Sequence, residues 1–171
     1  MGRGRRRGGT REALISEAID PNEWVLHPKS AWSERADFVA NVTIGDETDE
    51  LKYEQLAFEQ LGGDRYRLCS VPFFAYGLHL GDEVELERRP VVGLTPSRVV
   101  TRSDYWVLRA FVEPGESAQR LERLLREHDA AVEVRGRLVA FAVRLSSLEA
   151  VRRQLDEIEQ APDFSYETGW N

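Results

Sequence analysis

The last third of the chain constrains the fold most. The spacing of its apolar residues switches repeatedly between the pattern typical of a strand and the pattern typical of an amphipathic helix. Residues 105–112 are rich in aromatic and β-branched side chains, which favours a strand. Ser117 can then N-cap a helix with a one-sided stripe. The stripe consists of Leu121, Leu124, Leu125 and His128.

The same alternation repeats to the end of the chain. Residues 131–135 and 138–145 read as strands that meet at Gly136, which predicts a hairpin. A second helix follows, and residues 164–168 alternate as a closing strand. Its stripe consists of Leu148, Val151, Leu155 and Ile158. The order β-α-β-β-α-β predicts a ferredoxin-like sandwich, with both helices on one face of a four-stranded antiparallel sheet.

The preceding part of the chain is dominated by short segments with a period of two. Glycine and proline turns separate them, which is typical of a small antiparallel sheet or a partly open barrel. The predicted strands cover residues 37–44, 52–59, 65–71, 83–88 and 98–102. The fold class predicted for the whole chain is therefore α+β.

These patterns divide the 171 residues into four parts. Residues 1–10 read as a disordered Gly/Arg tail, and 11–35 as a short helix (11–19) followed by an irregular arm. Residues 36–103 form the small β subdomain and 104–171 the ferredoxin-like subdomain. Since the latter is small for an independent core, we expect the two subdomains to pack as one unit.

The charge of the chain is unevenly distributed. Lysine and arginine number 23 against 30 acidic residues, a net charge of −7, and five of the arginines lie within residues 1–11. Without that segment, 18 basic residues face 30 acidic ones, so the remainder carries −12. Such a body repels nucleic acid and suits a basic partner or simply high solubility. RNA or DNA contact is expected at most weakly, through the arginine-rich tail.

One segment resembles a known family. Residues 71–84, VPFFAYGLHLGDEV, follow a glycine-rich turn and strand at 62–68 and the pair Tyr53-Glu54. Together they resemble an uncharacterised, mainly bacterial family, domain of unknown function 4265, over about residues 37–168. The resemblance implies a fold but no activity and no catalytic residue.

The physical reading of this segment is a folding corner. Phe73, Phe74 and Tyr76 can close the end of a small sheet, and Asp82 can accept a backbone hydrogen bond that fixes the next bend. The alternative is a small enzyme or ligand-binding module that uses a cleft between the subdomains near Tyr76, His79 and Asp82. Phe73 and Phe74 are candidate binding residues beside these three.

No catalytic, metal or cofactor constellation stands out in the sequence. His27, His79 and His128 are read as structural or surface residues, because a metal site needs three or four ligands. The single cysteine, Cys69, reads as a small buried residue and excludes an internal disulfide, which favours the cytoplasm. No apolar run approaches the roughly 18–20 residues of a membrane span.

The remaining candidate is an acidic stretch at the start of the second predicted strand. Its binding residues are predicted to be Asp46, Glu47, Asp49, Glu50 and Glu54. We expect a non-catalytic protein-binding accessory or immunity-type factor that presents this acidic surface to a basic protein. The sequence does not reveal an oligomeric state.

Overall fold

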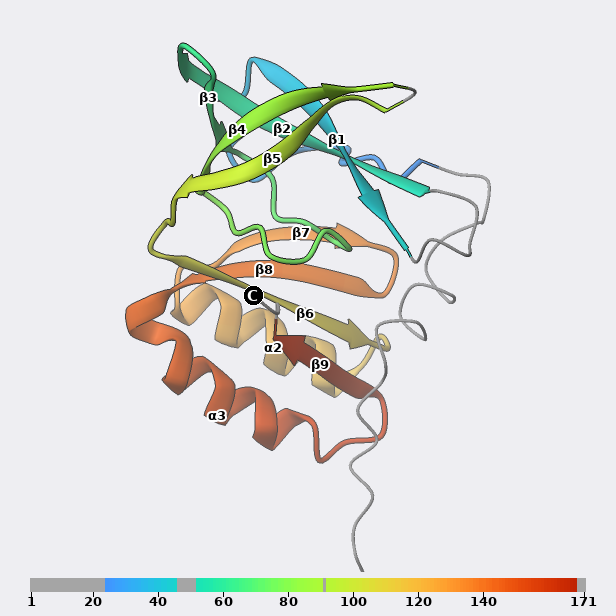
Figure 1. The fold of residues 1–171 in the computed structure, drawn as a ribbon. Helices are drawn as coiled ribbons and strands as arrows, with labels where there is room; N and C mark the ends of the chain where they lie inside the picture. Colours follow the sequence, from blue (N-terminus) through green and yellow to red (C-terminus); the bar gives the residue numbers. More distant parts are fainter. Residues whose placement is uncertain (1–23, 46–51, 91, 169–171) are drawn as a thin grey trace, which may run out of the picture.

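A computed structural model describes residues 24–45, 52–90 and 92–168. Two antiparallel sheets are stacked on one another, and two helices cover the far face of the second sheet (Figure 1). The mixed α+β class is thus confirmed. The predicted tail and the predicted helix over residues 11–19 lie outside the described residues.

The first sheet is a five-stranded meander whose spatial order follows the sequence. Its strands are β1 (Phe38–Ile44), β2 (Lys52–Gly62), β3 (Arg65–Leu68), β4 (Glu83–Arg89) and β5 (Gly93–Thr101). The sheet is curved enough for β1 to contact β5, and Asn41 Nδ2 donates to the carbonyl oxygen of Val92 at 2.8 Å. These two strands share no backbone ladder, so the sheet is not a closed barrel.

The second sheet has the strand order β7-β8-β6-β9, and every neighbouring pair is antiparallel. Its elements are β6 (Tyr105–Val112), α2 (Glu116–Glu127), β7 (Ala131–Arg135), β8 (Leu138–Arg144), a 3₁₀ turn (Leu145–Ser147), α3 (Leu148–Ile158) and β9 (Phe164–Thr168). The bounds of β6, β7 and β9 are those predicted from the sequence.

The prediction that Ser117 is the N-cap of helix α2 is wrong. Helix α2 begins at Glu116 with Gly115 as N-cap, and it has no side-chain cap. Ser117 lies one position inside the helix, where its buried hydroxyl donates to Asp163 Oδ1 at 2.7 Å. This bond joins the start of α2 to the loop before β9.

The second sheet contributes to two separate cores because its strands alternate. Leu108 and Phe141 face the helices, where they pack with Leu155. Val107 and Ala140 face the first sheet and belong to a core with residues such as Phe58. The chain between β3 and β4 runs through the core that lies between the two sheets (Figure 1).

Candidate functional site

The segment from Val71 to Ala75 is buried between the sheets without belonging to either. Val71, Phe73, Phe74 and Ala75 are each at most 2% exposed. Buried backbone N–H and C=O groups need partners, and an irregular segment cannot find them in a strand ladder. Ionised side chains from three distant parts of the chain supply these partners.

Glu54 of β2 accepts most of the N–H groups. Its Oε1 accepts from the amide of Phe73 at 2.5 Å, and its Oε2 from Phe74 at 2.9 Å and Ala75 at 2.6 Å. The side chain of Glu54 is fully buried. Three amide donors favour an ionised carboxylate, which has no proton of its own to place.

Glu133 of β7 performs the same role at the start of the segment. Its Oε1 accepts from the amide of Val71 at 2.6 Å and from the amide of Ala31 at 2.9 Å. Glu133 belongs to the second sheet, so this carboxylate ties both the segment and the N-terminal arm to that sheet.

His27 lies between the two carboxylates. Its Nε2 lies 2.9 Å from Glu54 Oε1, and its Nδ1 hydrogen-bonds to Glu133 Oε2. Since both oxygens are acceptors, both ring nitrogens donate and the ring is an imidazolium. We call His27, Glu54 and Glu133 the buried charge cluster.

The pKa values of His27 and Glu54 shift in the directions that such contacts require. Burial lowers the pKa of His27, but the hydrogen bonds and charges of Glu133 and Glu54 outweigh it and raise the pKa to about 9. Burial raises the pKa of Glu54. The hydrogen bonds and charge of His27 and the amides of Phe73 and Phe74 together lower it by more, so the pKa lies below its ordinary value. His27 and Glu54 are therefore both charged at neutral pH.

Arg109 of β6 supplies the complementary donors. It is 1% exposed, and it donates from Nε to the carbonyl oxygen of Pro72 at 3.1 Å and from Nη2 to that of Ala75 at 3.0 Å. Its guanidinium lies 4.4 Å from the ring centroid of Tyr76, whose hydroxyl hydrogen-bonds to Glu167. Carboxylates thus hold the N–H groups of the segment, and a guanidinium holds its carbonyls.

The end of the motif is fixed by Asp82. Its Oδ2 accepts from the amide of His79 and its Oδ1 from the amide of Ser103, both at 2.9 Å, and Arg102 lies 2.8 Å from Oδ2. His79 Nδ1 accepts from the amide of Val107 at 3.1 Å, which places the ring proton on Nε2. The predicted role of Asp82 at a bend matches this geometry.

The predicted site residues therefore fall into two groups. The candidates in residues 71–84 lie close together, but in the interior of the protein. Phe73, Phe74, His79 and Asp82 are at most 2% exposed, and Tyr76 is half-buried. Their polar atoms bind the chain itself, and no observation favours the alternative enzyme or ligand module, which stays a prediction.

The acidic candidates separate in the same way. Glu54 is buried, so its assignment to an acidic surface is wrong: it lies on a stretch of β2 that is covered on both faces. Asp46, Glu47, Asp49 and Glu50 lie outside the described residues.

Sequence reasoning missed the roles of His27, Glu133 and Arg109. A usable signal existed for two of them, since Arg109 and Glu133 are charged residues in the middle of apolar strands. No local signal marks His27, whose partner Glu133 lies 106 positions away.

An exposed aromatic surface lies where the described chain begins. Val25 is fully buried and bonds to β2, its amide donating to Tyr53 and its carbonyl accepting from Gln55, both at 2.9 Å. The alternation of this extended segment turns Trp24 and Leu26 outward, 45% and 52% exposed. The Trp24 ring packs on Tyr53 with centroids 4.9 Å apart.

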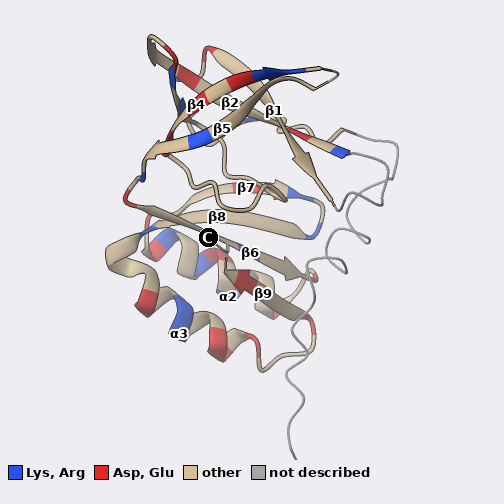
Figure 2. Ribbon diagram, viewed as in Figure 1, with Lys and Arg blue, Asp and Glu red and all other residues tan. Residues whose placement is uncertain are grey.

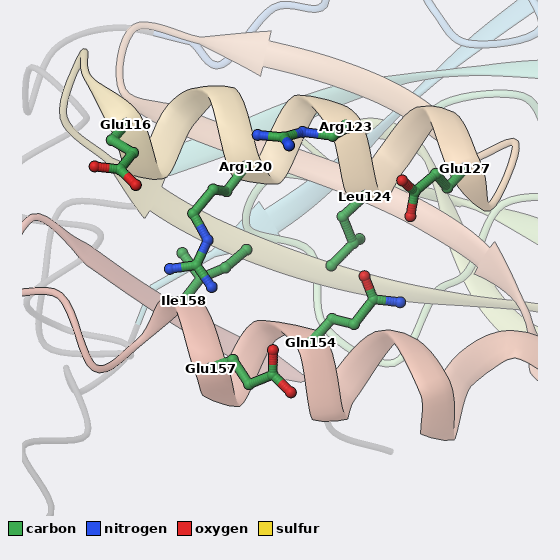
Figure 3. Close-up of a pocket in the computed structure, with 8 residues that line it drawn as sticks. All are labelled: Glu116, Arg120, Arg123, Leu124, Glu127, Gln154, Glu157 and Ile158. Carbon is green, nitrogen blue, oxygen red and sulfur yellow. The ribbon is translucent and has the colours of Figure 1, made fainter.

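A groove of about 370 Å³ lies between α2 and α3, on the outer side of the molecule (Figure 3). Leu124 and Ile158 line it together with Arg120, Gln154 and Glu157. Its charges are of both signs, as on the helices and on β4 and β5 generally (Figure 2). None of the motif residues lines this groove.

The described residues contain neither a metal-binding cluster nor a membrane-spanning helix. No group of three or more His, Cys, Asp or Glu side chains there is arranged to hold a metal ion. No helix in this part of the chain is both long and apolar enough to span a membrane.

Comparison with known proteins supports the resemblance read from residues 71–84. A family model described as domain of unknown function (DUF4265) matches residues 54–166. A solved structure titled "Novel crystal structure of a hypothetical protein from Neisseria gonorrhoeae" is similar with a TM-score of 0.67 and 19% identity, over 77% of this chain and 92% of that one. At this identity the likeness concerns the fold alone. No curated protein matches the sequence.

Proposed function

Because the chain belongs to the DUF4265 family, whose description assigns no activity, its function has to be argued from its own surface. We propose that it is a non-catalytic accessory or immunity-type factor that binds a basic protein. The binding surface consists of the exposed pair Trp24 and Leu26 and the acidic segment that joins β1 to β2. We call it the aromatic-acidic surface.

The observation that carries this proposal is the exposed Trp24 packed on Tyr53. Tryptophan rings are among the residues that contribute most binding energy at protein interfaces, and a ring already held in place loses little conformational freedom on binding. Val25, the next residue, is hydrogen-bonded to β2 through both its amide and its carbonyl, which fixes the ring's position relative to the sheet.

The acidic segment is attached at the same end of the sheet. Ile44 pairs with Lys52 and Thr43 with Tyr53, so the connection between β1 and β2 starts and finishes beside the residue that supports Trp24. Four of its residues, Asp46, Glu47, Asp49 and Glu50, are acidic. Opposite charge speeds encounter with a basic partner and suppresses wrong ones.

The interior also supports a binding role over a catalytic one. Glu54, Glu133 and Arg109 are engaged in holding the segment from Val71 to Ala75, and Asp82 holds the bend before β4, so these groups are not presented to a substrate. By contrast, the surface beside Trp24 has no such structural task.

The test is capture of proteins from a lysate of the source organism on the immobilised full chain, followed by elution with rising salt. We expect a basic protein that moderate salt releases. Combined neutralisation of Asp46, Glu47, Asp49 and Glu50 to Asn or Gln should abolish capture. Neutralising four helix acids, Glu122, Glu127, Glu149 and Glu157, changes the net charge equally and should leave capture intact.

Trp24→Ala should then weaken binding of the captured protein about tenfold or more. Leu145→Ala is its control, because Leu145 is similarly exposed (47%) but lies in the 3₁₀ turn before α3. Equal losses in both charge variants, or capture that Trp24→Ala does not affect, would refute the proposed surface.

Two finer features belong to the same proposal. We propose that the second half is a ferredoxin-like sandwich, which its strand order and its two helices on one face support. We also propose a cytoplasmic location, which the single, fully buried Cys69 supports.

A further inference from the structure

We propose that residues 11–19 form a helix that packs on the outer face of the first sheet and shields the aromatic-acidic surface until a partner displaces the helix. The face consists of β1, the middle of β2 and the exposed pair Trp24 and Leu26, and we call it the uncharged face. The docking of the helix does not depend on the proposed function, whereas its shielding role rests on that function.

The uncharged face follows from the register of β1 on β2. Leu56 and Phe58 point into the core, so the residues that alternate with them point outward, together with their partners on β1. Farther across the sheet the outer side carries ion pairs, such as Arg67 with Glu59. Strand β1 has no charged residue along its length (Figure 2). The outward residues of this part are Val39, Asn41, Thr43, Tyr53, Gln55 and Ala57.

Large apolar side chains on this face are open to solvent. Val39 is 55% exposed, and Trp24 and Leu26 are exposed to a similar extent. Trp24 belongs to the same face because its ring packs on Tyr53. A sheet face that carries apolar groups and no charge is the kind of surface that a helix covers in a layered fold.

The segment that precedes Trp24 supplies a matching helix. Residues 11–19 lie outside the described part of the chain, and their sequence predicts a helix with a one-sided apolar stripe. A helix this short is not stable alone in water, so it needs an apolar face on which to form. The stripe consists of Leu14, Ile15, Ala18 and Ile19.

The dimensions of the helix and of the face agree. A helix over residues 11–19 is about 13.5 Å long, and β2 extends about 13 Å from Tyr53 to Ala57. Residues 20–23 join the helix to Trp24, and a connection of this length reaches at most about 14 Å. So short a tether holds the segment at an effective concentration of the order of millimolar, which favours it over an untethered occupant such as a second copy.

The direction of the arm sets the direction of the helix. Val25 pairs with β2 in parallel, so the chain before Trp24 is joined at the Lys52 end of that strand. Pro21 cannot continue a helix, which allows the chain to turn back over the face. Ile19 then lies nearest Trp24, and the stripe runs toward the far end of the face.

The first test measures how fast a thiol reagent modifies Val39→Cys in the full chain. Charging the stripe with Leu14→Glu and Ile15→Glu should speed the reaction roughly tenfold, as expected when a helix docked nine-tenths of the time is released. Glutamate is a good helix former, so this pair of changes removes the apolar contact rather than the helix propensity.

Three controls accompany this measurement. Ala13→Glu with Ser16→Glu adds the same charge on the opposite side of the helix and should leave the rate at position 39 unchanged. A cysteine at Val134, a strand valine of the second sheet with the same exposure (56%), should react equally fast in every background. The native Cys69 does not contribute, because it is buried and burial raises its pKa to about 11.

The second test measures the affinity for the basic protein captured in the experiment of the proposed function. Release of the docked helix should tighten binding by the same roughly tenfold, because no helix then has to be displaced. The pair Leu14→Glu and Ile15→Glu should show this gain, and the pair on the opposite side of the helix should not.

Equal rates at position 39 in the wild-type and stripe-charged backgrounds, or equal acceleration by both glutamate pairs, would overturn the docked helix. Protection that disappears on dilution would assign the face to a second copy and overturn it as well. A docked helix without a gain in affinity would refute the shielding role. If no basic protein is captured at all, the proposed function fails, and the thiol rates still decide the docking.

Discussion

The two faces of the second sheet are stabilised differently. On one face Leu108 and Phe141 meet Leu155 across a core of apolar side chains supplied by regular helices and strands. On the other face, β6 and β8 pack against a core that also contains the buried charged side chains of Glu54, His27 and Arg109. The two faces differ because an irregular backbone segment, Val71 to Ala75, lies between the two sheets, whereas only regular helices pack on the other face.

Helices and strands satisfy their own peptide groups, so apolar packing is enough to hold them. The segment from Val71 to Ala75 has no ladder, and burying it would leave several N–H and C=O groups unsatisfied. Ionised side chains provide those bonds. The comparison teaches that buried charge here is the condition for burying an irregular segment.

The largest expected effect comes from removing Glu54. Glu54→Ala leaves three buried amides without their acceptor and His27 without one of its two carboxylates, so we expect a loss of about 4 kcal/mol in the free energy of unfolding. Leu155→Ala, in the apolar core, should cost about 3 kcal/mol through the cavity it leaves. Urea denaturation measures both.

Glu54→Gln keeps the size of the side chain but turns an amide group toward amide donors, so it should also destabilise the protein. If Glu54→Ala or Glu54→Gln costs less than about 1 kcal/mol, the buried charge cluster does not have the role assigned to it.

The second effect is a dependence on pH that belongs to the charged core alone. The pKa of His27 is about 9 in the folded protein against 6.5 ordinarily. A raised folded pKa gives stability that is complete below about pH 6.5 and is lost as pH rises through about 9. Between pH 7 and pH 9 we expect a loss of about 2 kcal/mol.

Urea denaturation at several pH values measures this loss. In His27→Gln the decline over this range should disappear, whereas Leu155→Ala should show the wild-type decline from a lower starting value. A decline that survives His27→Gln would assign it to another group.

The smallest expected losses of stability come from replacing either of two turn glycines by alanine. Gly81 in the motif has φ +84°, and an added Cβ would lie 3.1 Å from both Ser103 Cβ and Trp32 Cη2. Gly136 in the β7–β8 turn has φ +59° and open space around it. Thermal denaturation should give losses of about 2 kcal/mol for Gly81→Ala and about 1 kcal/mol for Gly136→Ala. Equal losses would mean that the packing around Gly81 adjusts freely.

The regular elements could be predicted from the sequence because their signal is local. The aromatic and β-branched content of residues 105–112 predicted the bounds of β6, and the spacing of Leu148, Val151 and Leu155 identified α3. The curvature of the first sheet was predicted in part, since turns indicate an antiparallel meander but not how nearly its edges meet.

The buried charge cluster could not be predicted in this way. Glu54 stands beside a run of acids, and that composition suggested a surface. Its side chain is enclosed by the segment from Phe73 to Ala75 and by His27, which reach it from other parts of the chain. The contact of His27 with Glu133 depends on the stacking of two sheets, which no spacing along the chain encodes.

The sources of the bonds around Val71–Ala75 also bear on the order of events during synthesis. A nascent chain that has emerged only as far as Thr101 contains every strand of the first sheet, yet it lacks Arg109 and Glu133. On the ribosome, the carbonyls of Pro72 and Ala75 and the amide of Val71 are therefore all satisfied only after more than thirty further residues (about two to six seconds of translation). During that interval Phe73 and Phe74 also lack the apolar side chains of the second sheet, such as Val107 and Ala140, with which they share a core in the folded protein.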